Sequence, residues 1–171
     1  MIKQCFKNID FRILWGAGCM TGIARAMEFL ALSLFALQEL GLPYLVTIIF
    51  AARMLPMSLL GIVIGTISER ISPISVIKFI YTLSNISTGI AILLVFTGNF
   101  NVIFAFLLAF INGITWVVDL AVRRRVLADN IDQNLLSSSL AMETLSNNAT
   151  RLIGPLCAGS LYAFVGLAGI F

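Results

Sequence analysis

Long apolar runs separated by short polar links dominate the sequence. They predict five membrane-spanning helices, at about 13–37, 44–66, 76–97, 102–123 and 135–165. Each run reaches the roughly 20 residues that a helix needs to cross a bilayer. None shows the two-residue alternation of a barrel strand, and a helix satisfies its own backbone hydrogen bonds in lipid. The pattern therefore predicts an all-α polytopic membrane protein.

A sixth apolar run is predicted to begin at about residue 167, where the chain reads Leu167-Ala168-Gly169-Ile170-Phe171. We therefore expect residues 1–171 to hold five helices and the start of a sixth, as a chain cut short. A further boundary lies within the charge-free stretch from Phe79 to Val118, where Thr97-Gly98-Asn99-Phe100-Asn101 has turn chemistry. The polar insert Gly65–Ile74 is expected to be a tight connection between the second and third helices.

Composition agrees with a lipid environment. Hydrophobic residues make up 60% of the chain and charged residues 11%, against about 25% charged in soluble domains. The net charge of +3 does not indicate nucleic acid, because the basic residues are not gathered on one polar face. The chain has no histidine, and its three cysteines lack metal-ligand spacing. We expect a lipid bilayer as partner, no metal, no cofactor and no enzymatic activity.

Outside the predicted spans, basic residues are confined to alternate connections. The links 38–43 and 98–101 and the tail 166–171 contain none. The positive-inside bias therefore predicts a cytoplasmic N-terminus and a C-terminus on the opposite side. The basic residues concerned are Lys3, Lys7 and Arg12 before the first run, Arg70 and Lys78 between the second and third, and Arg123, Arg124 and Arg125 after the fourth.

Polar residues form helical stripes inside three of the predicted spans. The stripes are Thr21, Arg25 and Glu28 in the first, Asn112, Thr115, Asp119 and Arg123 in the fourth, and Ser139, Glu143, Asn147 and Arg151 in the fifth. Because ionisable groups are costly in a membrane, such stripes indicate a shared, water-accessible cavity, with the third helix as a support. The alternative is that pairs such as Arg25–Glu28 and Glu143–Arg151 only pin helices together. The candidates for cavity lining or proton coupling are Arg25, Glu28, Asp119, Glu143, Asn147 and Arg151.

Two further features lie inside spans. Arg53, in the second, reads as a buried or snorkelling arginine. In the fifth, Pro155 follows Gly154 and frees backbone groups, which favours a bend; Gly159 belongs to the same element. The spacing Gly18-x-x-x-Gly22 in the first span allows close helix approach.

The run Gly65-Thr66-Ile67-Ser68-Glu69-Arg70 resembles the G-x-x-x-D-R-x-x-R-R signature of the major facilitator superfamily. Ala52-Arg53-x-x-Pro56 and Arg123-Arg124 to Asp129 extend the likeness. Arg151-Leu152-Ile153-Gly154-Pro155, followed by Ala158-Gly159, is similar to an element of the bacterial efflux branch that includes enterobactin exporters and macrolide efflux proteins. The sequence departs from the signature at Glu69, where aspartate is usual, and at Pro73-Ile74, where a basic pair is usual.

The resemblance implies a gate formed by Gly65, Glu69 and Arg70, with fewer salt bridges because the basic pair is absent. It implies a fold of two six-helix halves around a central site. Residues 1–171 then form the incomplete N-terminal half of a proton-coupled efflux permease for a small amphipathic molecule, inactive alone, in a bacterial inner membrane. Its partners are the substrate, protons and the missing C-terminal half. Glu28, Asp119 or Glu143 is the expected titrating group, because a low-dielectric site disfavours a charged carboxylate.

One alternative remains open. The chain is then a stand-alone five-span membrane protein that acts as a scaffold or as a half-transporter with an oligomeric partner. A membrane-embedded enzyme is disfavoured, because only Asp119 and Glu143 are available for acid–base chemistry.

Overall fold

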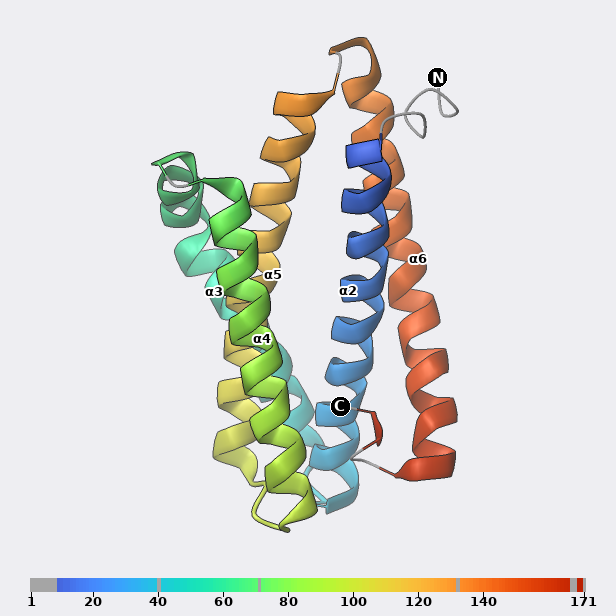
Figure 1. The fold of residues 1–171 in the computed structure, drawn as a ribbon. Coiled ribbons are helices and arrows are strands. Elements are labelled where there is room, and N and C mark those ends of the chain that lie inside the picture. Colours follow the sequence, from blue (N-terminus) through green and yellow to red (C-terminus); the bar gives the residue numbers. More distant parts are fainter. Residues whose placement is uncertain (1–8, 40, 71, 132, 167–168, 171) are drawn as a thin grey trace.

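The computed structural model is built from long helices that run roughly along one axis (Figure 1). It describes residues 9–39, 41–70, 72–131, 133–166 and 169–170, which contain helices and no strand. The helices are α2 (Ile9–Leu34), the π-helical η1 (Phe35–Glu39) that follows it, α3 (Pro43–Arg70), α4 (Pro73–Phe96), α5 (Val102–Asn130) and α6 (Gln133–Val165). The all-α prediction is therefore confirmed for the described part of the chain.

Three helical stretches are long and apolar enough to cross a membrane. They are Phe11–Gln38, Pro73–Phe96 and Val102–Asp129. The apolar part of α3 within the described side chains, Pro43–Leu59, is shorter. The polar stripe of α6 interrupts its apolar character, and α6 is not among the three. Five spans therefore stay a prediction, whereas several membrane-length helices are present.

The turn predicted at 97–101 is confirmed. α4 ends at Phe96 and α5 begins at Val102. Gly98 has a φ of +69°, a conformation that glycine adopts without a steric penalty. The Asn101 side chain accepts hydrogen bonds from the backbone N–H groups of Ile103 (3.0 Å) and Phe104 (3.2 Å), so it caps the start of α5.

The tight connection predicted within Gly65–Ile74 is confirmed, but it is shorter than the predicted bounds. α3 continues to Arg70 and α4 begins at Pro73, so only two residues separate the helices. Glutamate and arginine are good helix formers, and proline suits a first helical position. The predicted end of the fourth helix at residue 123 is also too early, because α5 continues to Asn130. Polar residues in this chain therefore extend helices past the apolar runs.

The helices form two groups. α2 packs mainly against α6, whereas α3 and α4 both pack against α5 (Figure 1). The start of α2, the α3–α4 junction and the α5–α6 junction lie toward one end of the bundle, and α6 ends at the other. The helix termini that adjoin the predicted cytoplasmic connections therefore lie toward one end of the bundle. Which side of a membrane that end faces stays a prediction.

Apolar clusters lie at both ends of the bundle interior. One is formed by α2, η1, α3, α4 and α5 and includes Leu32, Phe35 and Ile49. The other joins α2, α5 and α6 around Phe11 and Leu127. Between them, buried polar residues follow α2 and α5, so the interior has an apolar–polar–apolar order along its axis.

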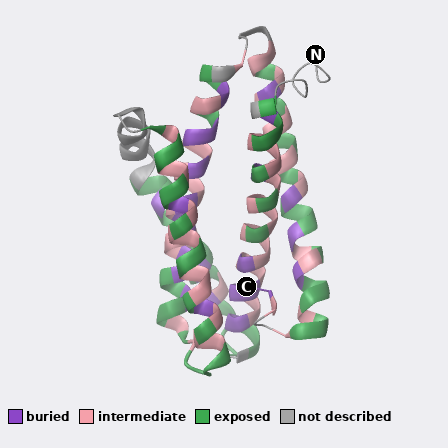
Figure 2. Cartoon of the chain, in the orientation of Figure 1, coloured by how far each residue is buried: buried purple, intermediate pink, exposed green. Residues whose placement is uncertain are grey.

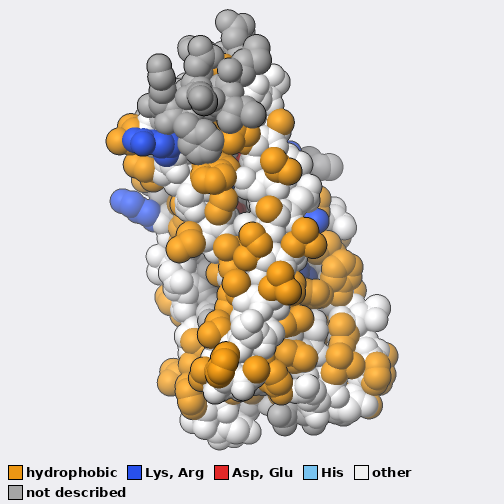
Figure 3. All heavy atoms as spheres, turned by 90° about the vertical axis from the view of Figure 1, so that its right-hand side faces the viewer, with side chains coloured by type: hydrophobic (Ala, Val, Ile, Leu, Met, Phe, Trp, Pro, Cys, Tyr) orange, Lys and Arg blue, Asp and Glu red, His pale blue; other side chains and the backbone are white. Residues whose placement is uncertain are grey.

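The outer surface is apolar. Buried positions lie on the facing sides of the helices and exposed positions on their outer sides (Figure 2). Large hydrophobic side chains on these outer sides are open, with Phe164 87% and Phe96 75% exposed. Figure 3 shows hydrophobic side chains over most of one face and few charged ones. Soluble monomers rarely expose apolar patches this extensive, so lipid is the environment that this surface fits.

Candidate functional site

A closed network of charges centres on Asp119 of α5. One of its carboxylate oxygens, Oδ2, accepts from Arg25 Nη2 of α2 at 2.7 Å. The other, Oδ1, accepts from Arg123 Nε at 2.8 Å and from the Tyr81 hydroxyl of α4 at 2.9 Å. The Asp119 side chain is 3% exposed. This carboxylate therefore joins three helices in the middle of the bundle.

Arg123 extends the network toward the N-terminal part of α2. Its Nη2 donates to the Tyr81 hydroxyl (2.8 Å) and to Thr21 Oγ1 (2.9 Å), and its Nη1 donates to the Leu14 carbonyl oxygen (3.1 Å). All three nitrogens of the guanidinium group are thus paired. A buried charge is tolerated under such conditions, because partners replace the hydrogen bonds to water.

Glycines make the room for these contacts. A Cβ on Gly18 would overlap the Arg123 guanidinium, and one on Gly22 would meet Thr150 Oγ1 of α6 at 2.7 Å. A Cβ on Gly154 would overlap Ala26 of α2. Gly154 and Gly22 thus permit close packing of α6 and α2, whereas Gly18 makes room for the Arg123 side chain of α5.

Glu28 is buried apart from the Asp119 network. It is 7% exposed, and its Oε1 accepts from Thr88 Oγ1 of α4 at 3.4 Å. The amide of Asn112 lies beside it, but within the described part of the chain neither polar atom of that amide has a hydrogen-bond partner at good geometry. Arg53 and Arg25 act on Glu28 electrostatically without an ion pair at salt-bridge distance. Glu28 is therefore a buried carboxylate with weak partners.

A cavity of about 550 Å³ opens between the two helix groups. α2 contributes Gly22, Arg25, Ala26 and Phe29, α3 contributes Phe50, Arg53 and Met54, α5 contributes Trp116, Leu120 and Arg124, and α6 contributes Thr144, Asn147, Asn148, Thr150, Arg151 and Pro155. The three striped helices therefore share this cavity with α3. α4 contributes no lining residue among those described, although it binds the buried carboxylates through Tyr81 and Thr88.

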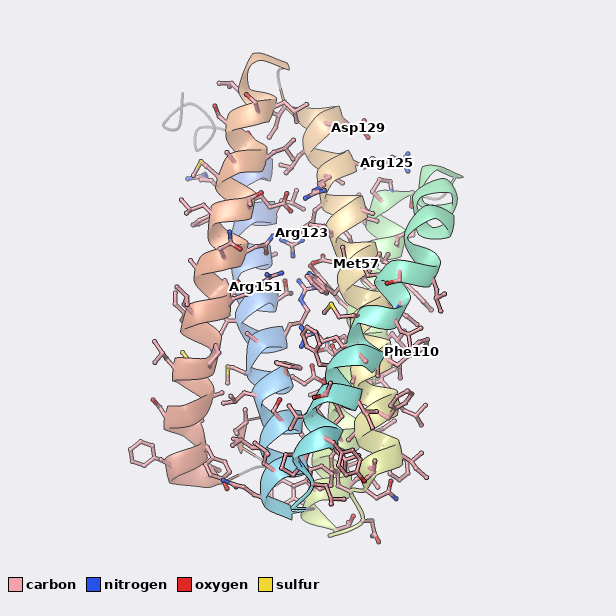
Figure 4. The ribbon with its side chains drawn as sticks, turned by 180° about the vertical axis from the view of Figure 1, so that it is seen from behind. Met57, Phe110, Arg123, Arg125, Asp129 and Arg151 are labelled. Atoms are coloured by element: carbon pink, nitrogen blue, oxygen red, sulfur yellow. The ribbon has the colours of Figure 1, made fainter. Side chains whose placement is uncertain are left out.

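Two arginines lie over the Trp116 ring in this cavity. The Arg53 guanidinium carbon is 5.8 Å from the centroid of the indole ring, and that of Arg151 is 5.5 Å from it. Arg53 also lies over Phe29, at 5.2 Å, and donates to the Arg25 carbonyl oxygen at 3.2 Å. Figure 4 shows Arg123 and Arg151 reaching into the interior from α5 and α6.

The predicted candidates separate into three places. Arg25, Asn147 and Arg151 line the cavity, Glu28 and Asp119 are buried behind it, and Glu143 lines a smaller pocket with Phe11, Trp15 and Arg123. Arg25 pairs with Asp119 and not with Glu28, and no Glu143–Arg151 ion pair occurs among the described residues.

The structure describes the predicted gate motif and the predicted helix-bend motif only in part. The backbone of α3 is helical through Gly65, Glu69 and Arg70, but their side chains lie outside the described residues. α6 continues as a helix through Pro155, and Gly159 is open, because no atom lies within 4 Å of the position that a Cβ would take there. A gate at Gly65, Glu69 and Arg70 stays a prediction, and so does a bend at Gly154, Pro155 and Gly159.

Comparison with known proteins decides the family. A family model described as a transmembrane secretion effector, of the major facilitator type, matches residues 4–171. The chain belongs to this family. No curated protein and no solved structure matches it.

Membership in the transmembrane secretion effector family agrees with the membrane-length helices and the apolar outer surface. It places this protein among the membrane transporters of the major facilitator superfamily rather than among enzymes. The resemblance to the superfamily is thereby confirmed. The match is to the family as a whole, so the efflux branch named above stays part of the proposal below.

Sequence reasoning misses several residues of this site. It treats Arg53 only as a buried or snorkelling arginine, although an intramembrane charge is itself a signal of a functional region. Tyr81 has the pattern of a mild polar residue in a supporting helix, yet it binds both Asp119 and Arg123. Nothing in the sequence distinguishes Trp116 from a tryptophan that faces lipid.

Proposed function

We propose that this transmembrane secretion effector protein exports a small amphipathic molecule in exchange for protons. We further propose that residues 1–171 form an incomplete N-terminal half of the transporter, in a bacterial inner membrane with the N-terminus cytoplasmic. The family supports transport. The direction, the coupling ion and the half-transporter organisation are our inferences.

The cavity carries this proposal. Its volume of about 550 Å³ is that of a small-molecule site, which commonly ranges over ~300–1,000 Å³. It lies at the polar middle of the bundle, between apolar clusters at both ends. Secondary transporters bind substrates near the midplane, between parts that move relative to each other. Aromatic rings and charged groups in one cavity suit an amphipathic molecule.

Glu28 is the best placed residue for proton coupling. Asp119 is balanced by two arginines, and Glu143 lines the smaller pocket and not the cavity. Glu28 has only a long hydrogen bond from Thr88 and an electrostatic interaction with Arg53, which lines the cavity. Protonation of Glu28 removes a negative charge that acts on Arg53. Loading of a proton on Glu28 and occupancy of the cavity are thereby linked.

A second half completes the proposed transporter. Alternating access requires two bundles on either side of the substrate. The described helices provide one wall of the cavity from α2 and α6 and another from α3 and α5. We expect transport to require the second half, so residues 1–171 alone should bind substrate without carrying it across a membrane.

The function is tested in the source cells. The coding sequence is deleted, and the small molecules in the medium and in the cells are compared by untargeted mass spectrometry with those of the parent. We expect at least one compound to fall in the medium and rise inside, and the wild-type sequence to restore it. Glu28→Gln should fail to restore export, whereas the matched variant Glu143→Gln should restore it. Unchanged compounds after deletion would contradict the proposal.

A further inference from the structure

The charged side chains that line the cavity are all of one sign. Among the lining residues, Arg25, Arg53, Arg124 and Arg151 carry the charge, and no aspartate or glutamate belongs to the described lining. Cavities of one sign concentrate ligands of the opposite sign, and low-dielectric walls strengthen this effect. The four arginines come from all four helices that form the cavity, so the charge surrounds the site.

Nearby carboxylates only partly compensate this charge. Asp119 is shared between Arg25 and Arg123, and Glu28 acts on Arg53. Arg124 and Arg151 have no carboxylate within salt-bridge distance among the described residues. Among the described residues, the two pockets and the buried groups beside them hold five arginines (25, 53, 123, 124 and 151) and three carboxylates (28, 119 and 143), which leaves an excess of two positive charges.

Flat apolar surface lies next to the unpaired charge. Arg53 and Arg151 both lie over the Trp116 ring, and Phe29 and Phe50 form an edge-to-face pair with ring centroids 5.8 Å apart. A guanidinium group presents several N–H donors in one plane and binds carboxylates, sulfonates or phosphates through two of them. The aromatic rings then cover the apolar part of the same ligand.

We propose that the substrate class of this cavity is an organic anion with a flat, apolar part, and that Arg151 is its principal anion-binding residue. The assignment deepens the proposed function and rests on it as far as transport is concerned. Binding itself is independent of transport. Arg151 is exposed to the cavity and has no ion pair among the described residues, so no salt bridge has to break when an anion binds.

A matched pair of fluorescent probes tests the charge requirement. The anion 8-anilinonaphthalene-1-sulfonate and the neutral N-phenyl-1-naphthylamine share one ring system and differ in the sulfonate. The purified chain is placed in nanodiscs of zwitterionic lipid, and empty nanodiscs give the background. Energy transfer from tryptophan reports binding. Because the chain has two tryptophans, Trp15→Phe leaves Trp116 as the single donor.

We expect the anionic probe to bind at least about tenfold more tightly than the neutral probe, the effect of one charge-assisted hydrogen bond. Salt should weaken the anionic probe only. Arg151→Gln should remove most of the preference, and Arg151→Lys should keep it. Arg12→Gln is the matched control, since Arg12 is an exposed arginine outside the cavity and should change neither probe. Circular dichroism confirms that each variant is folded.

Three results would overturn the assignment. They are equal affinity for the two probes, an unchanged preference in Arg151→Gln, and an equal loss in Arg12→Gln. The metabolite comparison separates this failure from failure of the proposed function. An exported compound that is neutral or cationic at neutral pH would contradict the anion assignment and leave export standing. Anion-selective binding without any exported compound would support the anion assignment and contradict the proposed export.

Discussion

Two polar regions meet on α5, and they balance charge in opposite ways. Around Asp119, every charged group has partners at hydrogen-bond distance, and the side chains of Asp119 and Arg123 are 3% and 6% exposed. Around Trp116, less than one helical turn away, Arg151 is exposed and has no ion pair among the described residues. A membrane protein holds charge inside only where partners or water compensate it. The first region is therefore suited to structure and the second to binding.

Removal of the Asp119 carboxylate should cause the largest loss of stability among the changes that test this contrast. Asp119→Asn leaves Arg25 and Arg123 buried without their counter-ion, and breaking such a buried pair costs about 3–5 kcal/mol. We expect a large fall in the thermal midpoint measured by circular dichroism in detergent. Asp129→Asn is the control, because its pair with Arg125 is long (3.7 Å) and exposed. Equal midpoints for the two variants would contradict a structural role for the Asp119 network.

Loss of one hydroxyl group should have a smaller effect in the same network. Tyr81→Phe removes the hydroxyl that donates to Asp119 and accepts from Arg123. Hydrogen bonds to charged groups contribute about 1.5–3 kcal/mol, and both ions keep other partners. The same thermal measurement checks the result. A double variant Tyr81→Phe/Asp119→Asn should lose less than the sum of the single changes, because the groups interact; strict additivity would argue against a shared network.

A methyl group tests how tightly the network is enclosed. Gly18→Ala places a Cβ where the Arg123 guanidinium lies, so this arginine must shift away from its partners. Overpacking costs about 1–3 kcal/mol, offset by about 1 kcal/mol of helix propensity. Gly89→Ala in α4 is the matched control, since nothing lies within 4 Å of its Cβ position and only the stabilising propensity gain applies. We expect opposite signs for the two thermal shifts.

The smallest expected effect on stability belongs to the open region. Arg151→Gln removes a charge that has no ion pair among the described residues but lies over the Trp116 ring, so the free energy of unfolding should change by no more than about 1 kcal/mol. The same variant should still lose most of its preference for the anionic probe. A loss of stability comparable with that of Tyr81→Phe would show that Arg151 is a structural residue, and the contrast between the two regions would disappear.

The helices can be predicted from apolar runs, but their ends cannot. The turn at Gly98 is predictable because glycine and asparagine interrupt a charge-free stretch. The end of α3 is missed because Ser68, Glu69 and Arg70 are polar, and polarity marks the edge of a bilayer and not the edge of a helix. The same reason explains why α5 continues past Arg123.

The helix face on which a residue lies is easier to predict than the residue with which it pairs. The spacing of Thr21, Arg25 and Glu28 gives their common face on α2 from helical geometry alone. Which group each of them meets depends on helix rotation and depth, so Arg25, which the alternative interpretation pairs with Glu28, pairs with Asp119 of α5 instead. The participation of Tyr81 and Trp116 depends on the packing of α4 and α5, and a single sequence does not encode it in any local pattern.

The position of Asp119 has a consequence for motion. Its network holds α2 to α4 and α5, while nothing in it comes from α6 among the contacts of the described residues. A rotation of the α2–α6 pair against the other three helices keeps these bonds only if the rotation axis passes close to Asp119. Displacement then grows with distance from that residue, so the helix ends travel furthest while the carboxylate stays nearly still.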